Sequence, residues 1–255
     1  MTAVRYETHE HCAVVTIDRP QARNAVNGAV AAGLEAALDR IEADDDVWIA
    51  IIAGAPPAFC AGADLKAVAA GEAAQLNTPR GGFAGFVKRS RTKPVVAAVD
   101  GPALAGGTEI VLACDLVVAS TAAQFGIPEV KRGLLASGGG LLRLGHKLPA
   151  NLAMECALTG DPIDAERAYR FGLVNELCAP GRALEHALAI AARVVANAPV
   201  AVRESRRVLL DATDGAGEEG WDLVERSERI VLASQDAREG VSALIDKRPP
   251  AWTGL

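Results

Sequence analysis

The chain has 255 residues, a formal net charge of −6, an apolar content of 50% and an aromatic content of only 4%. This length allows one large domain or two modest ones, and it is enough to bury a substantial core. The negative charge argues against nucleic acids and anionic membrane surfaces as main partners, because both recruit clusters of basic residues.

The polar and sulfur-containing residues also argue against several classes of protein. The cysteines are far apart, odd in number and without a C-x-x-C pair: Cys12, Cys60, Cys114, Cys156 and Cys178. We therefore expect reduced, buried thiols rather than disulfides or a zinc site, and the four histidines also lack metal-ligand spacing. The first twenty residues lack the apolar segment of a signal peptide, and no apolar run approaches the roughly 18 residues of a membrane span. A cytoplasmic protein without a bound metal is expected.

The first half of the chain alternates strands with helical sequence. Alternating apolar residues predict two short strands near the amino terminus, Val4–Thr8 and Ala13–Asp18. Asn27 is a suitable cap for a helix running to about Glu42, since apolar residues recur there every three to four positions. Buried strands are predicted at Trp48–Ile52, Val95–Val99 and Leu116–Ala119. Residues 69–91 have no clear period, and we expect a mobile connection with a short helix there.

From Ala150 onward the pattern is chiefly helical, except for a late strand predicted at Leu173–Cys178. Helices with one charged face are predicted at Ala183–Ala196, Val200–Leu210, Glu219–Ser234 and Asp236–Lys247. Pro199 separates the first two of these, and its fixed φ suits the first turn of the second. Strands alternating with helices, followed by a helical tail, predict an α/β fold with one spiral or layered body and a helical extension.

Two glycine-rich turns lead into helical sequence. Ala61-Gly62-Ala63 precedes Asp64, and Gly106-Gly107 precedes Thr108-Glu109. The first N–H groups of a helix have no internal partner and lie at the positive end of its dipole. If both turns face one point, the amides of Ala63 and Gly106 form an oxyanion hole. Taken singly, each sequence is explained equally well as a tight turn.

Glu109 and Glu129 lie twenty positions apart in sequence that is poor in charge. A single glutamate at a helix start is more often a cap or dipole partner than a catalyst. Two carboxyls facing one small, dry site cannot both ionise easily, so one keeps its proton near neutral pH. Such a pair is a ready acid/base couple, each proton transfer being worth typically ~10²–10⁴-fold in rate.

Four blocks of sequence, in order, resemble the signature blocks of the crotonase (enoyl-CoA hydratase/isomerase) superfamily: Asp18–Ala25, Phe59–Lys66, Gly101–Asp115 and Phe125–Glu129. The resemblance covers essentially the whole chain. It implies a crotonase-type ββα spiral core at residues 1–195, which holds the active site, and a C-terminal helical trimerisation region at residues 196–255. By the same analogy, the expected assembly is a homotrimer or a dimer of trimers.

The resemblance implies an enoyl-CoA hydratase that adds water syn to a trans-2-enoyl-CoA to give 3-hydroxyacyl-CoA. Ala63 and Gly106 match the backbone donors to the thioester oxygen. Glu109 and Glu129 match the glutamates that hold a water, one taking its proton and the other protonating Cα. Substrate and CoA contacts are expected at Ala22, Arg23, Asn24, Ala61, Gly62, Asp64, Leu65, Lys66, Gly107 and Ser137. No cofactor is implied, because coenzyme A is part of the substrate.

The sequence also departs from the family pattern. Ala136-Ser137 stand where hydratases commonly have Pro-Gly, in a turn that helps to seat the water. Arg23 puts a charge near the expected CoA entrance, and Lys131 and Arg132 are expected to face outward rather than towards Glu129. The alternatives are a double-bond isomerase of the same fold, which tolerates the loss of one carboxylate, and a non-catalytic acyl-CoA-binding subunit. The acyl group of the substrate stays open.

Overall fold

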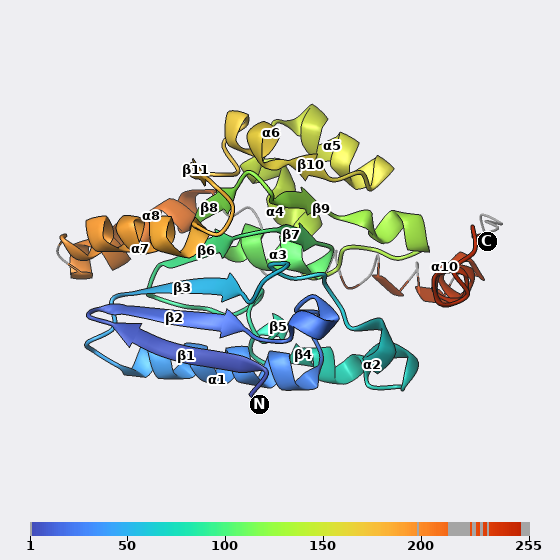
Figure 1. The fold of residues 1–255 in the computed structure, drawn as a ribbon, viewed down its shortest axis with the longest axis horizontal. Coiled ribbons are helices and arrows are strands. Elements are labelled where there is room, and N and C mark those ends of the chain that lie inside the picture. The colour runs from blue at the N-terminus through green and yellow to red at the C-terminus, as the bar shows by residue number, and fades with distance from the viewer. Residues whose placement is uncertain are drawn as a thin grey trace.

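The computed structural model describes residues 2–197, 199–213, 225, 228, 229, 232, 233 and 235–250. Its central layer is a six-stranded sheet in the order β1-β2-β3-β6-β8-β11 (Figure 1). These strands are β1 (Val4–His9), β2 (Cys12–Ile17), β3 (Ile49–Gly54), β6 (Val95–Val99), β8 (Leu116–Ser120) and β11 (Glu176–Cys178). Only β1 pairs antiparallel, with β2; the other neighbours are parallel.

Two smaller sheets accompany the central one. One has the order β10 (Ile163–Asp164), β9 (Gln124–Gly126) and β7 (Pro102–Leu104), and the other pairs β4 (Asn77–Thr78) with β5 (Gly82–Phe83). Three 3₁₀ turns are η1 (Pro20–Ala22), η2 (Ala73–Leu76) and η3 (Pro128–Arg132). The described helices are α1 (Gly28–Ala43), α2 (Leu65–Ala69), α3 (Gly106–Ala113), α4 (Gly140–Lys147), α5 (Ala150–Thr159), α6 (Ala165–Arg170), α7 (Ala183–Val195), α8 (Pro199–Thr213) and α10 (Gln235–Ile245).

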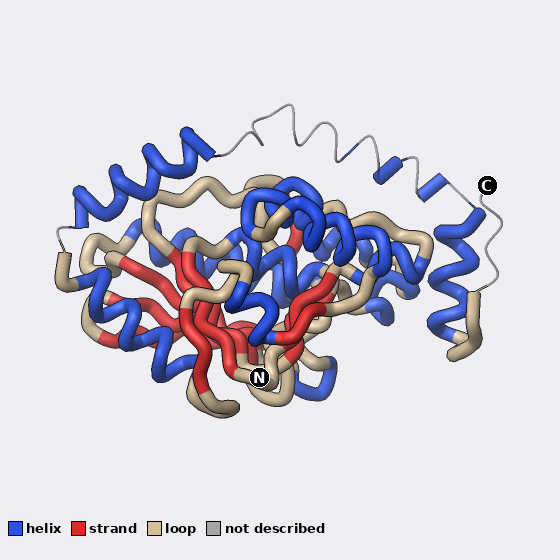
Figure 2. The backbone as a smooth tube through the Cα atoms, turned by 90° about the horizontal axis from the view of Figure 1, so that it is seen from above, coloured by secondary structure: helices blue, strands red, loops and turns tan. Residues whose placement is uncertain are grey.

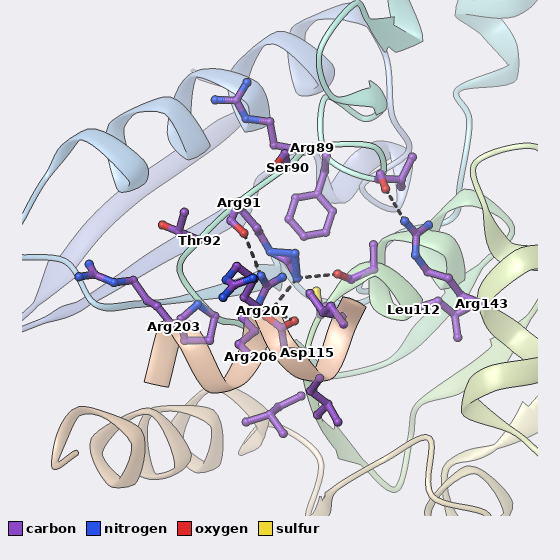
Figure 3. Close-up of a pocket in the computed structure, with 18 of the residues that line it drawn as sticks. Arg89, Ser90, Arg91, Thr92, Leu112, Asp115, Arg143, Arg203, Arg206 and Arg207 are labelled. Atoms are coloured by element: carbon purple, nitrogen blue, oxygen red, sulfur yellow. Dashed lines mark hydrogen bonds and ion pairs between the residues drawn. The ribbon is translucent and has the colours of Figure 1, made fainter. Parts of the chain in front are cut away.

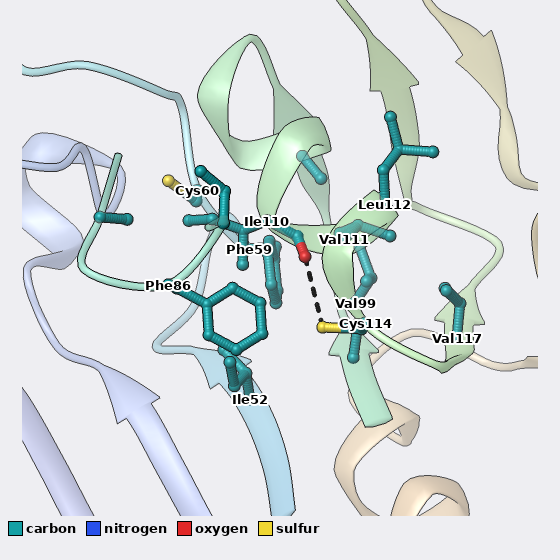
Figure 4. Close-up of a cluster of buried hydrophobic side chains, with 14 of the residues drawn as sticks. Ile52, Phe59, Cys60, Phe86, Val99, Ile110, Val111, Leu112, Cys114 and Val117 are labelled. Atoms are coloured by element: carbon teal, nitrogen blue, oxygen red, sulfur yellow. Dashed lines mark hydrogen bonds between the residues drawn. The ribbon is translucent and has the colours of Figure 1, made fainter. Parts of the chain in front are cut away.

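The central strands are buried on both faces, as parallel strands covered by helices must be. Successive residues of β3 point to opposite sides: Ile52 belongs to the cluster that includes Leu34 of α1, and Ile51 to the cluster that includes Ile190 of α7. The first cluster extends to Phe86 and to Ile110 of α3, the helix that also carries Glu109 (Figure 4). The sheet and its two helical layers therefore form a rigid support for the loops at its edges.

Most predicted elements of the first half are confirmed. The strand Val95–Val99 has the predicted bounds, and the side chain of Asn27 caps α1 by accepting a hydrogen bond of 3.1 Å from the Val30 amide. The late strand is shorter than predicted, because the chain turns over residues 172–173 and pairs only from Glu176 onward. The five cysteines are buried thiols, as expected.

The prediction for residues 69–91 is right about a short helix but incomplete. The segment contains η2 and the strand pair β4–β5, and it is anchored by the buried side chains of Ala84, Phe86 and Val87. Strands of two or three residues are too short for alternation to reveal them. The same reason explains why the small sheet β10-β9-β7 has no signal in the sequence.

The described parts of the carboxy-terminal region lie at opposite ends of the molecule. In Figures 1 and 2, α7 and α8 lie at one end of the molecule and α10 at the other. There α10 packs on η3, since a Cβ added to Gly240 would meet the Arg132 carbonyl oxygen at 1.8 Å. Most of the predicted helix Glu219–Ser234 lies outside the described residues, and the domain boundary at residue 195 stays a prediction.

Neither a membrane helix nor a metal cluster is present in the part of the chain that the structure describes. No helix there combines the length and apolar character needed to cross a bilayer. Among the same residues, His, Cys, Asp and Glu side chains do not gather in threes as a metal ion requires.

Candidate active site

Three loops meet at the carboxyl edge of the central sheet, following β3, β6 and β8. An isolated bridge pairs Cys60 with Ala103, and the Leu104 amide donates to the Cys60 carbonyl at 3.0 Å. The Ala105 amide donates to the Gly126 carbonyl at 2.8 Å, which adds the third loop. The three later sequence blocks, distant along the chain, are thus joined by backbone hydrogen bonds.

The two glycine-rich turns are in direct contact. A Cβ added to Gly62, whose φ is +87°, would lie 2.7 Å from the Ala105 Cβ and 3.0 Å from the Gly106 nitrogen. A Cβ on Gly107 would lie 2.1 Å from the Cys60 carbonyl oxygen. Neither position has room for a side chain, so glycine is required for this close approach.

The amides of Ala63 and Gly106 are oriented by different means. Ala63 is held by a bridge to Val26, and α2 begins only two residues later, so its N–H is not part of a helical first turn as the sequence suggested. Gly106 is the first residue of α3, and it follows Ala105 at φ 53° and ψ −128°, a conformation that costs on the order of 1–3 kcal/mol. Within the described chain, neither amide donates a hydrogen bond to the protein. Two unpaired donors on touching turns suit a developing oxyanion.

Glu109 lies in the first turn of α3 and is 3% exposed. Its Oε1 accepts a hydrogen bond of 2.9 Å from the Gly140 amide. Burial raises the pKa of Glu109 to about 7, while the Gly140 amide and the positive charge of Arg143 act in the opposite direction. A Cβ on Gly138 would lie 2.5 Å from Oε2, so the loop before α4 fits closely around this carboxyl group.

Glu129 lies in η3, on the loop that follows β9. Burial raises its pKa to about 8, and the negative charge of Glu109 adds to the effect. Its Oε2 is buried and has no hydrogen-bond partner among the described residues. A buried carboxyl oxygen without a partner is costly, and a bound polar group at this point would relieve that cost.

Thr108 connects α3, which carries Glu109, to β9, which leads to Glu129. Its hydroxyl accepts a hydrogen bond of 2.9 Å from the Gly126 amide and lies 2.6 Å from the Ala103 carbonyl, to which it can donate. Thr108 is 1% exposed and therefore positions α3 against β9. This role is not predictable from the sequence, because the residues around a threonine at a helix start do not reveal its distant partner.

Several residues predicted to contact CoA hold the loops together. The Asn24 side chain is fully buried, and its amide donates to the carbonyls of Ala55 and Ala58 at 2.7 and 2.6 Å. Asp64 caps α2 through the Lys66 amide and forms an ion pair of 2.9 Å with Arg19. Any CoA contact at Asn24 is therefore left to its backbone.

The other predicted contact residues lie around these loops. Exposed side chains at this edge are those of Arg23 and Lys66, while Ala22, Ala61 and Leu65 are half-buried. The Ala61 amide donates to the Arg23 carbonyl at 3.0 Å, which fixes the first block against the second.

Residues after Glu129 complete the surroundings of the site. The Ser137 hydroxyl donates to the Glu228 carboxylate at 2.7 Å, and the charge of Glu228 reaches Glu109, whose pKa it raises. Lys131 faces outward, as predicted, and pairs with Asp161.

The Phe83 ring lies against Gly106, since a Cβ there would meet ring carbons at 2.3 and 2.4 Å. Sequence reasoning missed Glu228 and Phe83, which nothing in their local sequence marks.

Comparison with known proteins yields consistent matches along the chain. Residues 7–255 match the profile of the family described as Enoyl-CoA hydratase/isomerase. A carnitinyl-CoA dehydratase from Salmonella arizonae is 38% identical over 246 residues, which cover 94% of each chain. The crystal structure of carnitinyl-CoA hydratase from Mycobacterium avium is similar over the whole of both chains, with a TM-score of 0.95 and 46% identity. The crystal structure of enoyl-CoA hydratase from Mycobacterium tuberculosis also matches over both full chains, with a TM-score of 0.81 and 45% identity.

Proposed function

The chain belongs to the enoyl-CoA hydratase/isomerase family and has the crotonase fold, and on this premise we propose that it adds water to a trans-2-enoyl-CoA, or removes it from a 3-hydroxyacyl-CoA. Its relatives are hydratases and dehydratases of CoA thioesters. The observation that carries the proposal is the pair of buried glutamates, Glu109 and Glu129, with pKa values raised to about 7 and 8.

The proposed reaction begins with polarisation of the thioester. Its carbonyl oxygen accepts hydrogen bonds from the amides of Ala63 and Gly106, which draw electron density from Cβ and hold the enolate oxygen that forms. Losing one such donor typically costs about 2.7–4 kcal/mol of activation energy. Because the polarising role belongs to the amides and CoA is part of the substrate, no separate cofactor is proposed.

We assign the base to Glu109 and the acid to Glu129. The Gly140 amide and the charge of Arg143 favour the ionised form of Glu109. The ionised form of Glu129 is favoured only by its own backbone amide, and Glu129 carries the higher pKa. Glu109 takes a proton from water as the water oxygen bonds to Cβ. The enolate then collapses and Cα takes the proton of Glu129. A proton passing from Glu109 to Glu129 restores the starting state.

A second candidate substrate class is favoured by Glu228. The names of several relatives refer to carnitinyl-CoA. This compound is a 3-hydroxyacyl thioester whose acyl group ends in a quaternary ammonium. Glu228 places a carboxylate near the site, hydrogen-bonded to Ser137 at 2.7 Å. A carboxylate there would attract a cationic acyl end.

The test is a turnover panel of enoyl-CoA thioesters from short to long chains, with one member that carries a quaternary ammonium. Hydration of an uncharged enoyl chain supports the first candidate. Preference for the cationic member, lost in Glu228→Gln, supports the second. Tight binding without turnover of any member would contradict both and favour the non-catalytic subunit. Mass measurement in solution tests the proposed trimer or dimer of trimers.

A further inference from the structure

A cavity of about 990 Å³ lies at the amino edge of the central sheet, opposite the edge that carries the catalytic loops (Figure 3). It is enclosed by α8, the residues 86–92 that lead into β6, and the carboxyl end of α3. None of Ala63, Gly106, Glu109 and Glu129 lines it. Its lining has a chemistry opposite to that of the glutamate site.

The lining is strongly cationic. Eight lysine and arginine side chains contribute to it: Lys88, Arg89, Arg91, Arg143, Lys147, Arg203, Arg206 and Arg207. Among the described residues of the lining, two side chains are acidic, Asp115 and Glu204. Figure 3 shows the guanidinium groups of Arg91, Arg206 and Arg207 directed towards the same region around Asp115.

Asp115 is already shared by several donors. Its carboxylate pairs with Arg91 at 3.1 Å and Arg206 at 2.9 Å, and it also accepts the Val95 amide at 2.7 Å. The negative charge of Asp115 raises the pKa of Lys147, whereas the positive charges of Arg91 and Arg143 lower it. Asp115 thus pairs with two of these cations, while Lys88 pairs with Glu225, Arg89 with Asp39 and Arg207 with Glu204. The lining still carries more positive than negative charge.

Two donors in this lining lack a partner. The Nε atoms of Arg89 and Arg91 are buried without a hydrogen-bond partner among the described residues, and the Arg91 side chain is only 8% exposed. An arginine cannot escape burial by losing its proton. An unpaired buried donor is costly, more so when it is charged. The Arg89 guanidinium already pairs with Asp39, whereas an anion bound beside Arg91 would supply an acceptor for its Nε.

We propose that this cavity is a binding site for an organic phosphate, separate from the CoA site. Guanidinium groups match phosphate oxygens in geometry and charge. The volume exceeds that of a phosphate group, and apolar side chains complete the wall: Phe86, Leu112, Val194, Val202 and Leu210. The phosphate lies among Arg91, Arg206 and Arg207, and the organic group contacts the apolar face of α8.

The experiment uses phenyl phosphate, which joins a phosphate to an apolar ring and does not resemble CoA. Calorimetry and thermal unfolding are measured with phenyl phosphate, inorganic phosphate and phenol, all at an ionic strength matched with NaCl. We expect one molecule bound per chain, a raised Tm, weaker binding of inorganic phosphate and none of phenol. CoA should not displace the probe.

Arg207→Gln is the informative variant, because Arg207 is exposed and its replacement leaves the Asp115 ion pairs intact. Roughly tenfold weaker binding is expected, about the value of one lost charge-assisted contact. The control is Arg170→Gln, an exposed arginine of α6 outside the cavity. Equal affinity of both variants, displacement of the probe by CoA, or no rise in Tm beyond that with NaCl would each overturn the proposal. If a second copy of the chain fills the cavity instead, the probe should give no rise in Tm beyond that with NaCl.

Discussion

The two ends of α3 face opposite kinds of site. At its amino end, Glu109 and Glu129 are buried acids whose pKa values rise. At its carboxyl end, Arg91 and Lys147 are buried bases whose pKa values fall. In both places burial disfavours charge, and only the sign of the charge differs.

The consequences differ because the groups differ. A carboxyl group can respond to burial by keeping a proton near neutral pH, and that proton is then available for catalysis. A guanidinium group cannot respond by losing its proton, so its charge has to be balanced by a partner. One end of the helix therefore favours proton transfer and the other favours anion binding.

The largest expected effect comes from removing a carboxylate at the amino end of α3. Glu109→Gln and Glu129→Gln should each lower kcat for hydration by ~10²–10⁴-fold, because each removes one of the two proton transfers. Stopped-flow absorbance of the enoyl thioester measures the loss. Glu166→Gln, at an exposed position of α6, is the matched control. Substantial activity left in one of the two catalytic variants would favour the isomerase instead.

The next effect tests the packing around Glu109. In Gly138→Ala the new methyl group would lie 2.5 Å from Glu109 Oε2, so the carboxyl or the loop has to move. We expect at least a tenfold loss of kcat, and destabilisation of about 1–3 kcal/mol as is typical of overpacking. Gly145→Ala is the control, because nothing lies within 4 Å of its Cβ. Normal activity of Gly138→Ala would show that this loop does not hold the carboxyl group.

The pH dependence should show both raised pKa values. The reaction requires ionised Glu109 and protonated Glu129, so kcat/KM should fall below pH about 7 and above pH about 8. The two limbs belong to the coupled pair rather than to either residue alone. A profile that stays flat from pH 5 to 9 would contradict the assignment.

The same pKa values predict a change in stability. Both carboxyls have an ordinary value of 4.5 and hold protons more tightly in the folded chain. Their favourable contribution is therefore full below pH about 4.5 and is lost as the pH rises through 7 and 8. Glu129→Gln should raise Tm relative to the parent protein more at pH 9 than at pH 5, which thermal unfolding at the two pH values measures.

The smallest effect tests whether the two ends of α3 influence each other. Arg143 lines the cationic cavity, and its charge lowers the pKa of Glu109. Arg143→Gln should move the acid limb of kcat/KM to higher pH and leave the basic limb in place. Arg170→Gln should move neither limb. A uniform loss of activity without a shift would indicate a purely structural role for Arg143.

Much of this architecture follows from local sequence. The apolar run at Val95–Val99 is long enough to define a buried strand, and Asn27 has the side chain that a helix start needs. The glycines at 62, 106 and 107 indicate close backbone approach, and the structure brings them together. The site residues on these loops were predictable from their own neighbours.

Other features depend on residues that meet only in the folded chain. Gly138 and Gly140 surround Glu109, and the Thr108 hydroxyl reaches across to Gly126. None of these contacts leaves a local pattern, since the partners are separated by roughly twenty to thirty positions. The hydrogen bond from Ser137 to Glu228 joins residues that are even farther apart in the sequence, by 91 positions.

The sequence by itself determined the strands, the glycine turns and the pair of glutamates, because each depends on the chemistry of a few consecutive residues. The tertiary structure determined which of these groups are buried away from water and which residues surround them. Burial and charge act through space, so the raised pKa values of Glu109 and Glu129 and the gathering of cations around Asp115 exist only once distant loops are packed together.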